Sequence, residues 1–134
     1  MKLLLDTHIL IWTLMRMPEL SPEARELIED RHNLLYYSTV SAWEVAIKHR
    51  LRPERIPCSG EKFVSLCGAS DMYPISLNNK HISVFESLKR PENAPQHKDP
   101  FDQILISQAK AENMVFLTHD KTLQYYDYSD IRIV

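Results

Sequence analysis

The sequence predicts one domain, residues 1–134, folded as a three-layer α/β/α sandwich around a central, mostly parallel sheet of four to five strands. Short apolar runs of strand length alternate along the whole chain with helical patterns, which is the order found in parallel sheets covered by helices. The 134 residues, of which 44% are hydrophobic and 25% charged, suit a single core. No repeat, low-complexity tract or interdomain linker divides the chain.

Strands are expected where short apolar or aromatic runs are bounded by polar or turn-forming residues. They fall at residues 2–5, 34–37, 72–77, 114–117 and 131–134. The first and fourth runs are almost entirely apolar, as in strands that are buried on both faces. Pro74 lacks a backbone N–H, and this places the third strand at an edge of the sheet.

Helices are expected between these runs. Apolar positions over 9–15 predict a buried helix that ends before Pro18, and Ser21 followed by Pro22 predicts the cap and first residue of the next. Ser41 is expected to begin a helix that reaches about Leu51. Further helices are expected at 63–67, at 78–88 and from an Asp99 cap to about residue 109, with an exposed loop over 89–98.

Composition excludes several classes of protein. The net charge of −2 and the pI near 6.3 are unlike those of proteins that bind nucleic acid by bulk positive charge. Only two glycines are present, so a glycine-rich phosphate loop is excluded. Cys58 and Cys67 lack metal-binding spacing and are interpreted as reduced, structural thiols. No apolar run approaches the ~20 residues of a membrane span, and a cytoplasmic location is expected.

Acidic residues recur where an apolar run gives way to a helix start. Asp6 and Asp120 follow the first and fourth strands, whereas Glu44 and Asp102 lie at the beginning of predicted helices. Because the carboxyl ends of parallel strands meet at one edge of a sheet, these four carboxylates could form one pocket. Such a pocket repels itself unless protons or a hard cation such as Mg²⁺ occupy it. Asp99 lies one helical turn before Asp102 and could share its face.

Each acid also has a purely structural explanation. Ser41 and Glu44 match a capping box, and Asp99 matches a helix cap. Asp6 could cap the first helix, and Asp120 could lie in a turn. Burying a carboxylate at the end of a central strand is nevertheless costly unless it is paired or bound to metal.

Threonine hydroxyls adjoin two of these acids. Thr7 follows Asp6 and Thr118 precedes Asp120 by two positions, and both could orient carboxylates or bound waters from an outer shell.

Four motifs in this order resemble the PIN-domain family and, within it, the VapC-like toxin ribonucleases of type II toxin–antitoxin pairs. The motifs are Leu4-Leu5-Asp6-Thr7-His8, Ser41-Ala42-Trp43-Glu44, Asp99-Pro100-Phe101-Asp102 through Ser107-Gln108-Ala109, and Leu117-Thr118-His119-Asp120. Their order, their spacing and the chain length all agree with the family. The resemblance therefore covers essentially the whole chain.

The resemblance implies a metal-dependent endoribonuclease. By it, Asp6, Glu44, Asp102 and Asp120 take the positions of the family's acidic quartet and hold one or two Mg²⁺ or Mn²⁺ ions. Asp102 is preferred to Asp99 as a ligand because its distance to Asp120 fits the family spacing better. Asp99 would then be a cap or an outer-shell acid. The resemblance also implies an RNA substrate, a cognate antitoxin that covers the acidic groove, and a homodimer.

Within this interpretation Asp6 and Asp102 are the first choices as direct ligands, with Glu44 and Asp120 completing the shell or positioning a water. His8 is a candidate for contact with the substrate. His119 is expected to point away from Asp120, because neighbours on an extended backbone face opposite sides.

Basic residues gather beyond Glu44 and around the long loop. They could hold the RNA backbone or form a solvated face, and they are Lys48, Arg50, Arg52 and Arg55, then Lys89, Arg90 and Lys98.

Three other functions are open to acids at strand ends. A response-regulator receiver would need paired acids after the first strand, whereas Asp6 stands alone, and a phosphoacceptor Asp where Ser38 stands. A haloacid-dehalogenase-type phosphatase would need an Asp in place of His8. The third alternative is a catalytically inactive RNA-binding or scaffolding domain, whose acids serve only as caps.

Overall fold

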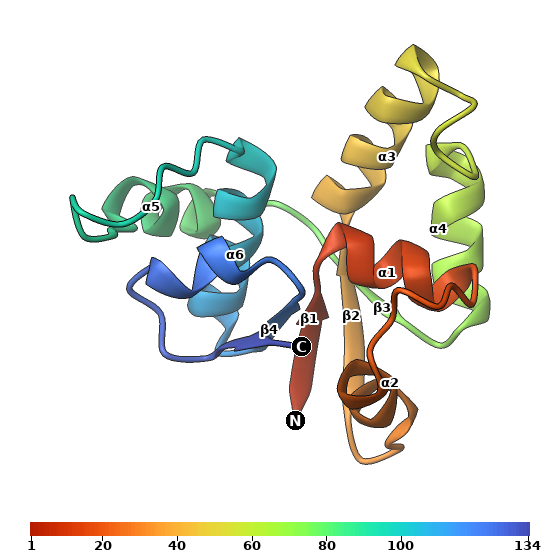
Figure 1. The fold of residues 1–134 in the computed structure, drawn as a ribbon, viewed down its shortest axis with the longest axis horizontal. Helices are drawn as coiled ribbons and strands as arrows, with labels where there is room; N and C mark the ends of the chain where they lie inside the picture. The colour runs from red at the N-terminus through yellow and green to blue at the C-terminus, as the bar shows by residue number, and fades with distance from the viewer.

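A computed structural model describes all residues from Met1 to Val134 and shows a five-stranded sheet flanked by helices (Figure 1). The strands are β1 (Lys2–Leu5), β2 (Leu34–Ser38), β3 (Tyr73–Ile75), β4 (Val115–Thr118) and β5 (Ile131–Ile133). The helices are α1 (Thr7–Leu14), α2 (Pro22–Glu29), α3 (Thr39–Leu51), α4 (Gly60–Ala69), α5 (Asn79–Ser87) and α6 (Pro100–Glu112), with a 3₁₀ helix η1 (Lys121–Tyr125).

The sheet is entirely parallel, with the strand order β3-β2-β1-β4-β5. β1 is central, and its Leu4 pairs with Tyr36 of β2 on one side and with Phe116 of β4 on the other. β3, which contains Pro74, is an edge strand as predicted. The predicted fold class is therefore confirmed.

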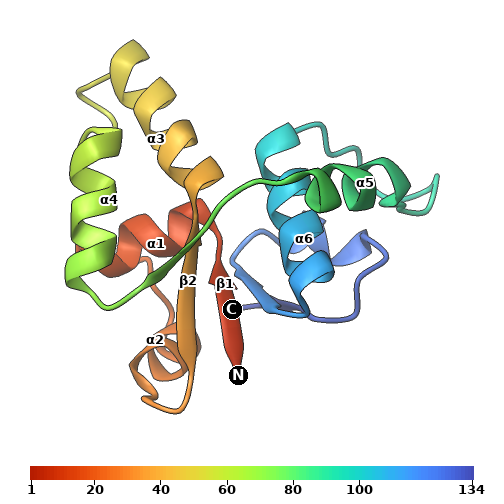
Figure 2. The same cartoon turned by 180° about the vertical axis from the view of Figure 1, so that it is seen from behind.

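Two apolar clusters, one on each face of the sheet, form the core. Leu3 and Leu5 pack with residues of α1, α2 and α4 on one face, whereas Leu4 and Phe116 pack with residues of α6 and η1 on the other. Figures 1 and 2 show α1 and α4 on one side of the central strands, and α6 with α5 beside it on the other. The strand β1 is thus buried on both faces, which explains its unbroken run of leucines.

Side-chain caps mark the helix starts, some of them predicted and others not. Ser21 accepts a hydrogen bond from the backbone of α2, and Asn78 and His81 form a capping box at α5. The prediction that Ser41 begins a helix is wrong. Strand β2 runs directly into α3, so that Ser38 is the cap and its hydroxyl accepts from Val40 N at 3.0 Å.

The segment between α5 and α6, residues 88–99, contains no helix or strand. It matches the predicted loop, although Arg90, Ala94 and His97 along it are half-buried. None of the helices combines the length and the hydrophobicity that crossing a membrane requires.

Candidate metal centre

The acids predicted from the sequence come from the carboxyl edge of the sheet. Asp6 directly follows the central strand β1, and Asp120 follows the neighbouring strand β4 by two residues. Glu44 lies in the second turn of α3, and Asp102 in the first turn of α6. The carboxylates are close enough that the charges of the other three all raise the pKa of Asp102.

Asp6 is 5% exposed and is held by two threonines. Its Oδ1 accepts from the backbone N of Thr7 at 2.7 Å, and its Oδ2 accepts from the hydroxyl of Thr118 at 2.6 Å. Burial raises the pKa of Asp6, although both hydrogen bonds act in the opposite direction. Thr7 and Thr118 therefore fix the orientation of a carboxylate that has no lysine or arginine partner.

Glu44 is 2% exposed, and both of its oxygens are engaged. Oε1 accepts from the hydroxyl of Thr7 at 2.8 Å, and Oε2 lies 2.6 Å from Lys48 Nζ. The hydroxyl of Ser41, the residue predicted as the cap, lies 2.9 Å from Thr7 Oγ1 and belongs to this cluster. Lys48, expected at the RNA-binding rim, thus neutralises Glu44, and the spacing of four residues in a helix is the sequence signal for such a pair.

Asp102 and Asp120 lie close together at the opening of the site. Burial, followed by the charges of Asp6 and Asp99, raises the pKa of Asp102 to about 8. Asp120 Oδ1 accepts from both the backbone N and the hydroxyl of Thr122, at 2.9 and 2.7 Å. A half-buried carboxyl with so high a pKa gains from a divalent cation, because the cation replaces its proton and offsets the neighbouring negative charges.

Asp99 caps α6 through its Oδ1, which accepts from Phe101 N at 2.9 Å. Its charge still reaches Asp102, but its position is that of a cap beside the pocket. Trp43 packs against Phe101 with ring centroids 5.4 Å apart, and this contact joins the helices that carry Glu44 and Asp102.

His97 is the site residue that the sequence did not reveal. Its Nε2 lies 3.2 Å from Asp102 Oδ2, its Nδ1 lies 2.9 Å from the hydroxyl of Tyr126, and its side chain is 8% exposed. Burial lowers the pKa of His97, against the charges of Asp120 and Asp99. The loop over residues 88–99 has no periodic pattern, so only proximity in sequence to Asp102 hinted at this contact.

Asp6 and Asp120 also line a hollow of about 240 Å³, together with His8, Trp12 and His119. His119, predicted to point away from Asp120, lines this hollow together with Asp120, and its Nδ1 contacts the backbone oxygen of Val134. Strand β4 ends at Thr118, so the alternation of an extended backbone no longer applies at His119. Trp12 contacts both imidazoles: its ring is tilted against His8, with centroids 5.8 Å apart, and edge-on to His119, with centroids 5.4 Å apart.

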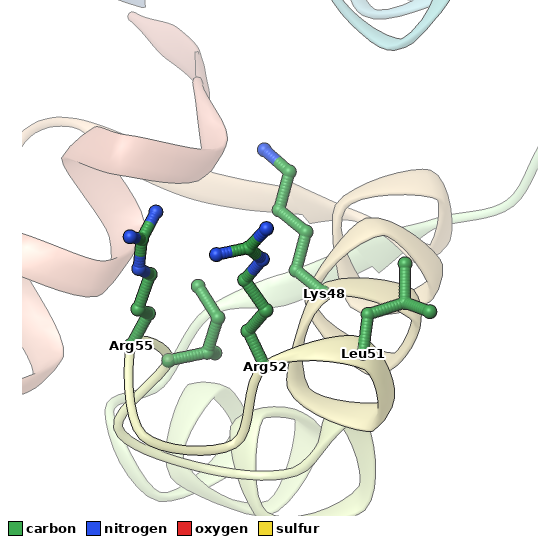
Figure 3. Close-up of a pocket in the computed structure, with 5 residues that line it drawn as sticks. Lys48, Leu51, Arg52 and Arg55 are labelled. Carbon is green, nitrogen blue, oxygen red and sulfur yellow. The ribbon is translucent and has the colours of Figure 1, made fainter.

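A basic groove of about 260 Å³ opens beyond α3 and is lined by Lys48, Leu51, Arg52, Arg55 and Ile56. The cationic ends of Lys48, Arg52 and Arg55 point to the same side (Figure 3). Arg50, predicted as a substrate contact, is exposed but does not line this groove.

Comparison with known proteins identifies the family. The PIN-domain model matches residues 3–127, and the chain therefore belongs to the PIN-domain family. This confirms the resemblance found in the sequence. No match was found among curated proteins.

The fold is similar to that of a chain in a solved crystal structure. The crystal structure of VapBC2 from Rickettsia felis, bound to a DNA fragment from their promoter, matches with a TM-score of 0.66. The sequences are 17% identical, and the match covers 92% of each chain.

Proposed function

We propose that this protein is a metal-dependent endoribonuclease that hydrolyses RNA phosphodiester bonds, and that it is the toxin of a type II toxin–antitoxin pair. The observation that carries the proposal is the acidic, partly buried environment of the Asp102 carboxyl group. A half-buried carboxyl with a pKa of about 8, surrounded by Asp6, Glu44 and Asp120 and without a lysine or arginine partner, suits a bound cation better than a helix cap.

The residues of the site fit Mg²⁺ or Mn²⁺. Carboxylate oxygens are the preferred ligands of both ions, and an atom of Asp102 and one of Asp120 lie within 4.8 Å of each other. When bound, the ion supplies activation of a water for in-line attack on a phosphodiester and stabilisation of the leaving oxygen. Asp6 contributes a carboxylate held by Thr7 and Thr118 at the base of the pocket.

The basic groove is the proposed path of the RNA backbone. Lys48 joins it to the acidic site, since the charges of Glu44, Asp99 and Asp102 all raise the pKa of its ammonium group against the effect of burial. Arg52 and Arg55 add further positive charge along the groove. An acidic centre with a basic flank fits an RNA substrate: the phosphate to be cleaved would bind the divalent ion, and neighbouring phosphates would contact the lysine and arginine side chains.

An antitoxin and a second copy of the chain are the proposed protein partners. An apolar hollow of about 370 Å³ lies between α3, α5 and α6, where it is lined by Val40, Trp43, Leu77, Ile82, Phe85, Pro100, Phe101 and Ile104. Trp43 is 62% exposed although it lies next to Glu44 in sequence. A partner that covers this surface would lie beside the acidic site and could block it. The toxin and its antitoxin would act in the cytoplasm, where the RNA substrate is found.

The test is cleavage of a labelled RNA by the purified protein with Mn²⁺. Asp102→Asn should abolish cleavage while the far-ultraviolet circular dichroism stays unchanged, because the amide keeps the size of the side chain. Glu86→Gln, on the exposed surface of α5, is the matched control and should cleave normally. Cleavage by Asp102→Asn at the normal rate would overturn the proposal.

One observation favours a second function, that of an RNA-binding domain without catalysis. Both oxygens of Glu44 are already engaged by Thr7 and Lys48, which leaves one acid of the quartet neutralised. This alternative predicts RNA binding that is independent of metal, no cleavage, and no rise of the melting temperature on adding Mn²⁺.

A further inference from the structure

The loop between α5 and α6 brings an imidazole into the acidic site. A nitrogen of His97 and one carboxylate oxygen each from Asp102 and Asp120 all lie within 4.8 Å of one another. Ligand atoms bonded to one ion at about 2.0–2.2 Å are at most about 4.4 Å apart. The three atoms are therefore grouped closely enough to be candidates for ligands of a single ion.

We propose that His97 is a nitrogen ligand of the divalent ion, so that the centre combines one imidazole with the carboxylates of Asp102 and Asp120 and selects Mn²⁺ over Mg²⁺. This inference rests on the proposed function only in that both need an ion at Asp102. Beyond the proposed function, it identifies His97 as the residue that determines the preference for Mn²⁺ over Mg²⁺.

The hydrogen bonds of His97 suit a metal ligand. Nε2 points at Asp102, and Nδ1 lies 2.9 Å from the hydroxyl of Tyr126. A phenol hydroxyl can either donate or accept, so the imidazole can carry its proton on Nδ1 and present the lone pair of Nε2 without losing that bond. A ring nitrogen fixed by a hydrogen bond on its far side is the usual arrangement for histidines that bind metals.

The surroundings hold the ring in place. His97 packs edge-on against Tyr126, with ring centroids 5.7 Å apart, and the guanidinium of Arg90 lies 5.1 Å from the centre of the Tyr126 ring. Tyr126 itself is 6% exposed. His97 therefore approaches the carboxylates from a packed position, which preorganises it as a ligand.

A nitrogen ligand changes which ion is preferred. Mg²⁺ favours oxygen ligands and octahedral geometry, whereas an imidazole ligand favours transition-metal ions over Mg²⁺. Among the transition-metal ions, Mn²⁺ is the one that also suits carboxylate ligands. An all-oxygen site made of Asp6, Asp102 and Asp120 would discriminate much less between the two ions.

A purely structural role for His97 leads to opposite expectations. If its imidazole only hydrogen-bonds Asp102, it competes with the ion for that oxygen, and its removal should tighten metal binding or leave it unchanged. If His97 is a ligand, its removal should weaken Mn²⁺ binding more than Mg²⁺ binding.

The first experiment uses Mn²⁺ alone with the full-length protein. Pulsed electron paramagnetic resonance of the Mn²⁺ complex should show coupling to a ¹⁴N nucleus, which should be replaced by the ¹⁵N pattern when histidine is labelled with ¹⁵N. His97→Ala should lose the coupling, whereas His119→Ala, which removes the imidazole beside Asp120, should keep it. No nitrogen coupling in the unmodified protein, or its survival in His97→Ala, overturns the inference.

The second experiment is calorimetric titration with Mn²⁺ and Mg²⁺. His97→Ala should weaken Mn²⁺ binding at least about tenfold and reduce the preference for Mn²⁺ by a similar factor. Tyr126→Phe, which keeps the ring but removes the hydroxyl, should weaken Mn²⁺ binding less and retain the nitrogen coupling. Equal losses for both ions, or tighter binding by His97→Ala, contradict a ligand role.

Neither readout involves RNA, so the two proposals fail separately. Nitrogen coupling without RNA cleavage would leave the metal site standing and remove the nuclease. Cleavage that requires Mn²⁺ in a protein without nitrogen coupling would do the reverse.

Discussion

Replacing Asp102 by asparagine should stabilise the metal-free protein at neutral pH. The carboxyl of Asp102 has a pKa of about 8 in the folded chain, against the usual 3.8. Between these values the folded chain holds a proton that the unfolded chain has released. Stability therefore falls as the pH rises from about 4 to about 8.

The size of the effect follows from the shift. pH 7 lies about three units above the pKa of Asp102 in the unfolded chain. At about 1.4 kcal/mol per unit, the raised pKa lowers the free energy of unfolding by at most about 4 kcal/mol. Relaxation and water entry around a side chain that is 16% exposed reduce this to about 2 kcal/mol. For a domain of this length, that corresponds to a rise in melting temperature of about 6 °C.

The assay is thermal unfolding of the unmodified protein and Asp102→Asn from pH 5 to pH 9 with a chelator present. The unmodified protein should lose stability across this range more steeply than the variant, so that the two curves separate as the pH rises. Glu86→Gln should follow the unmodified protein. The reasoning is refuted if Asp102→Asn melts below the unmodified protein at pH 7.5, or if the two curves run parallel.

Three further predictions concern packing, RNA binding and the orientation of the site. Gly60→Ala should lower the free energy of unfolding by about 1–3 kcal/mol, because the new Cβ would lie 2.7 Å from a side chain of α3. Gly68→Ala should instead raise it by about 0.5–1 kcal/mol, because the new Cβ meets nothing within 4 Å and alanine favours the helix. Denaturant unfolding measures both, and equal effects would disprove the close approach of the two helices. Arg52→Glu should weaken RNA binding and flatten its salt dependence more than Arg50→Glu does, because only Arg52 lines the basic groove. A filter-binding titration measures both effects, and equal losses of affinity for the two variants would show that the RNA does not follow this groove. Thr118→Val should destabilise the fold by about 2 kcal/mol and weaken Mn²⁺ binding, because it deletes the 2.6 Å hydrogen bond to the carboxylate after β1; an unchanged melting temperature and metal affinity would contradict this orienting role.

Residues whose role depends on strand ends and caps were predictable from the sequence. Asp6 and Asp120 follow buried strands, and in a parallel sheet that position alone brings them to one edge. Asp99 followed by Pro100 predicts the cap and first residue of α6, and both are observed. In each case the inference needs only the nearest residues and the common direction of the strands in a parallel sheet.

Residues whose role depends on tertiary contacts were not predictable. His97 reaches Asp102 from an irregular loop, and no periodicity in the sequence encodes the path of such a loop. Ser38 rather than Ser41 caps α3 because β2 continues into the helix without a turn. The ion pair of Glu44 with Lys48 could have been inferred from their spacing, but the hydrogen bond from Thr7 to the other oxygen of Glu44 could not.

The most direct measurement is an anomalous difference map from crystals soaked in Mn²⁺. A peak should lie about 2.0–2.4 Å from carboxylate oxygens of both Asp102 and Asp120, at the carboxyl edge between β1 and β4. Ordered carboxylates without a peak, or manganese bound only elsewhere on the surface, would contradict the assignment of this edge as a metal centre.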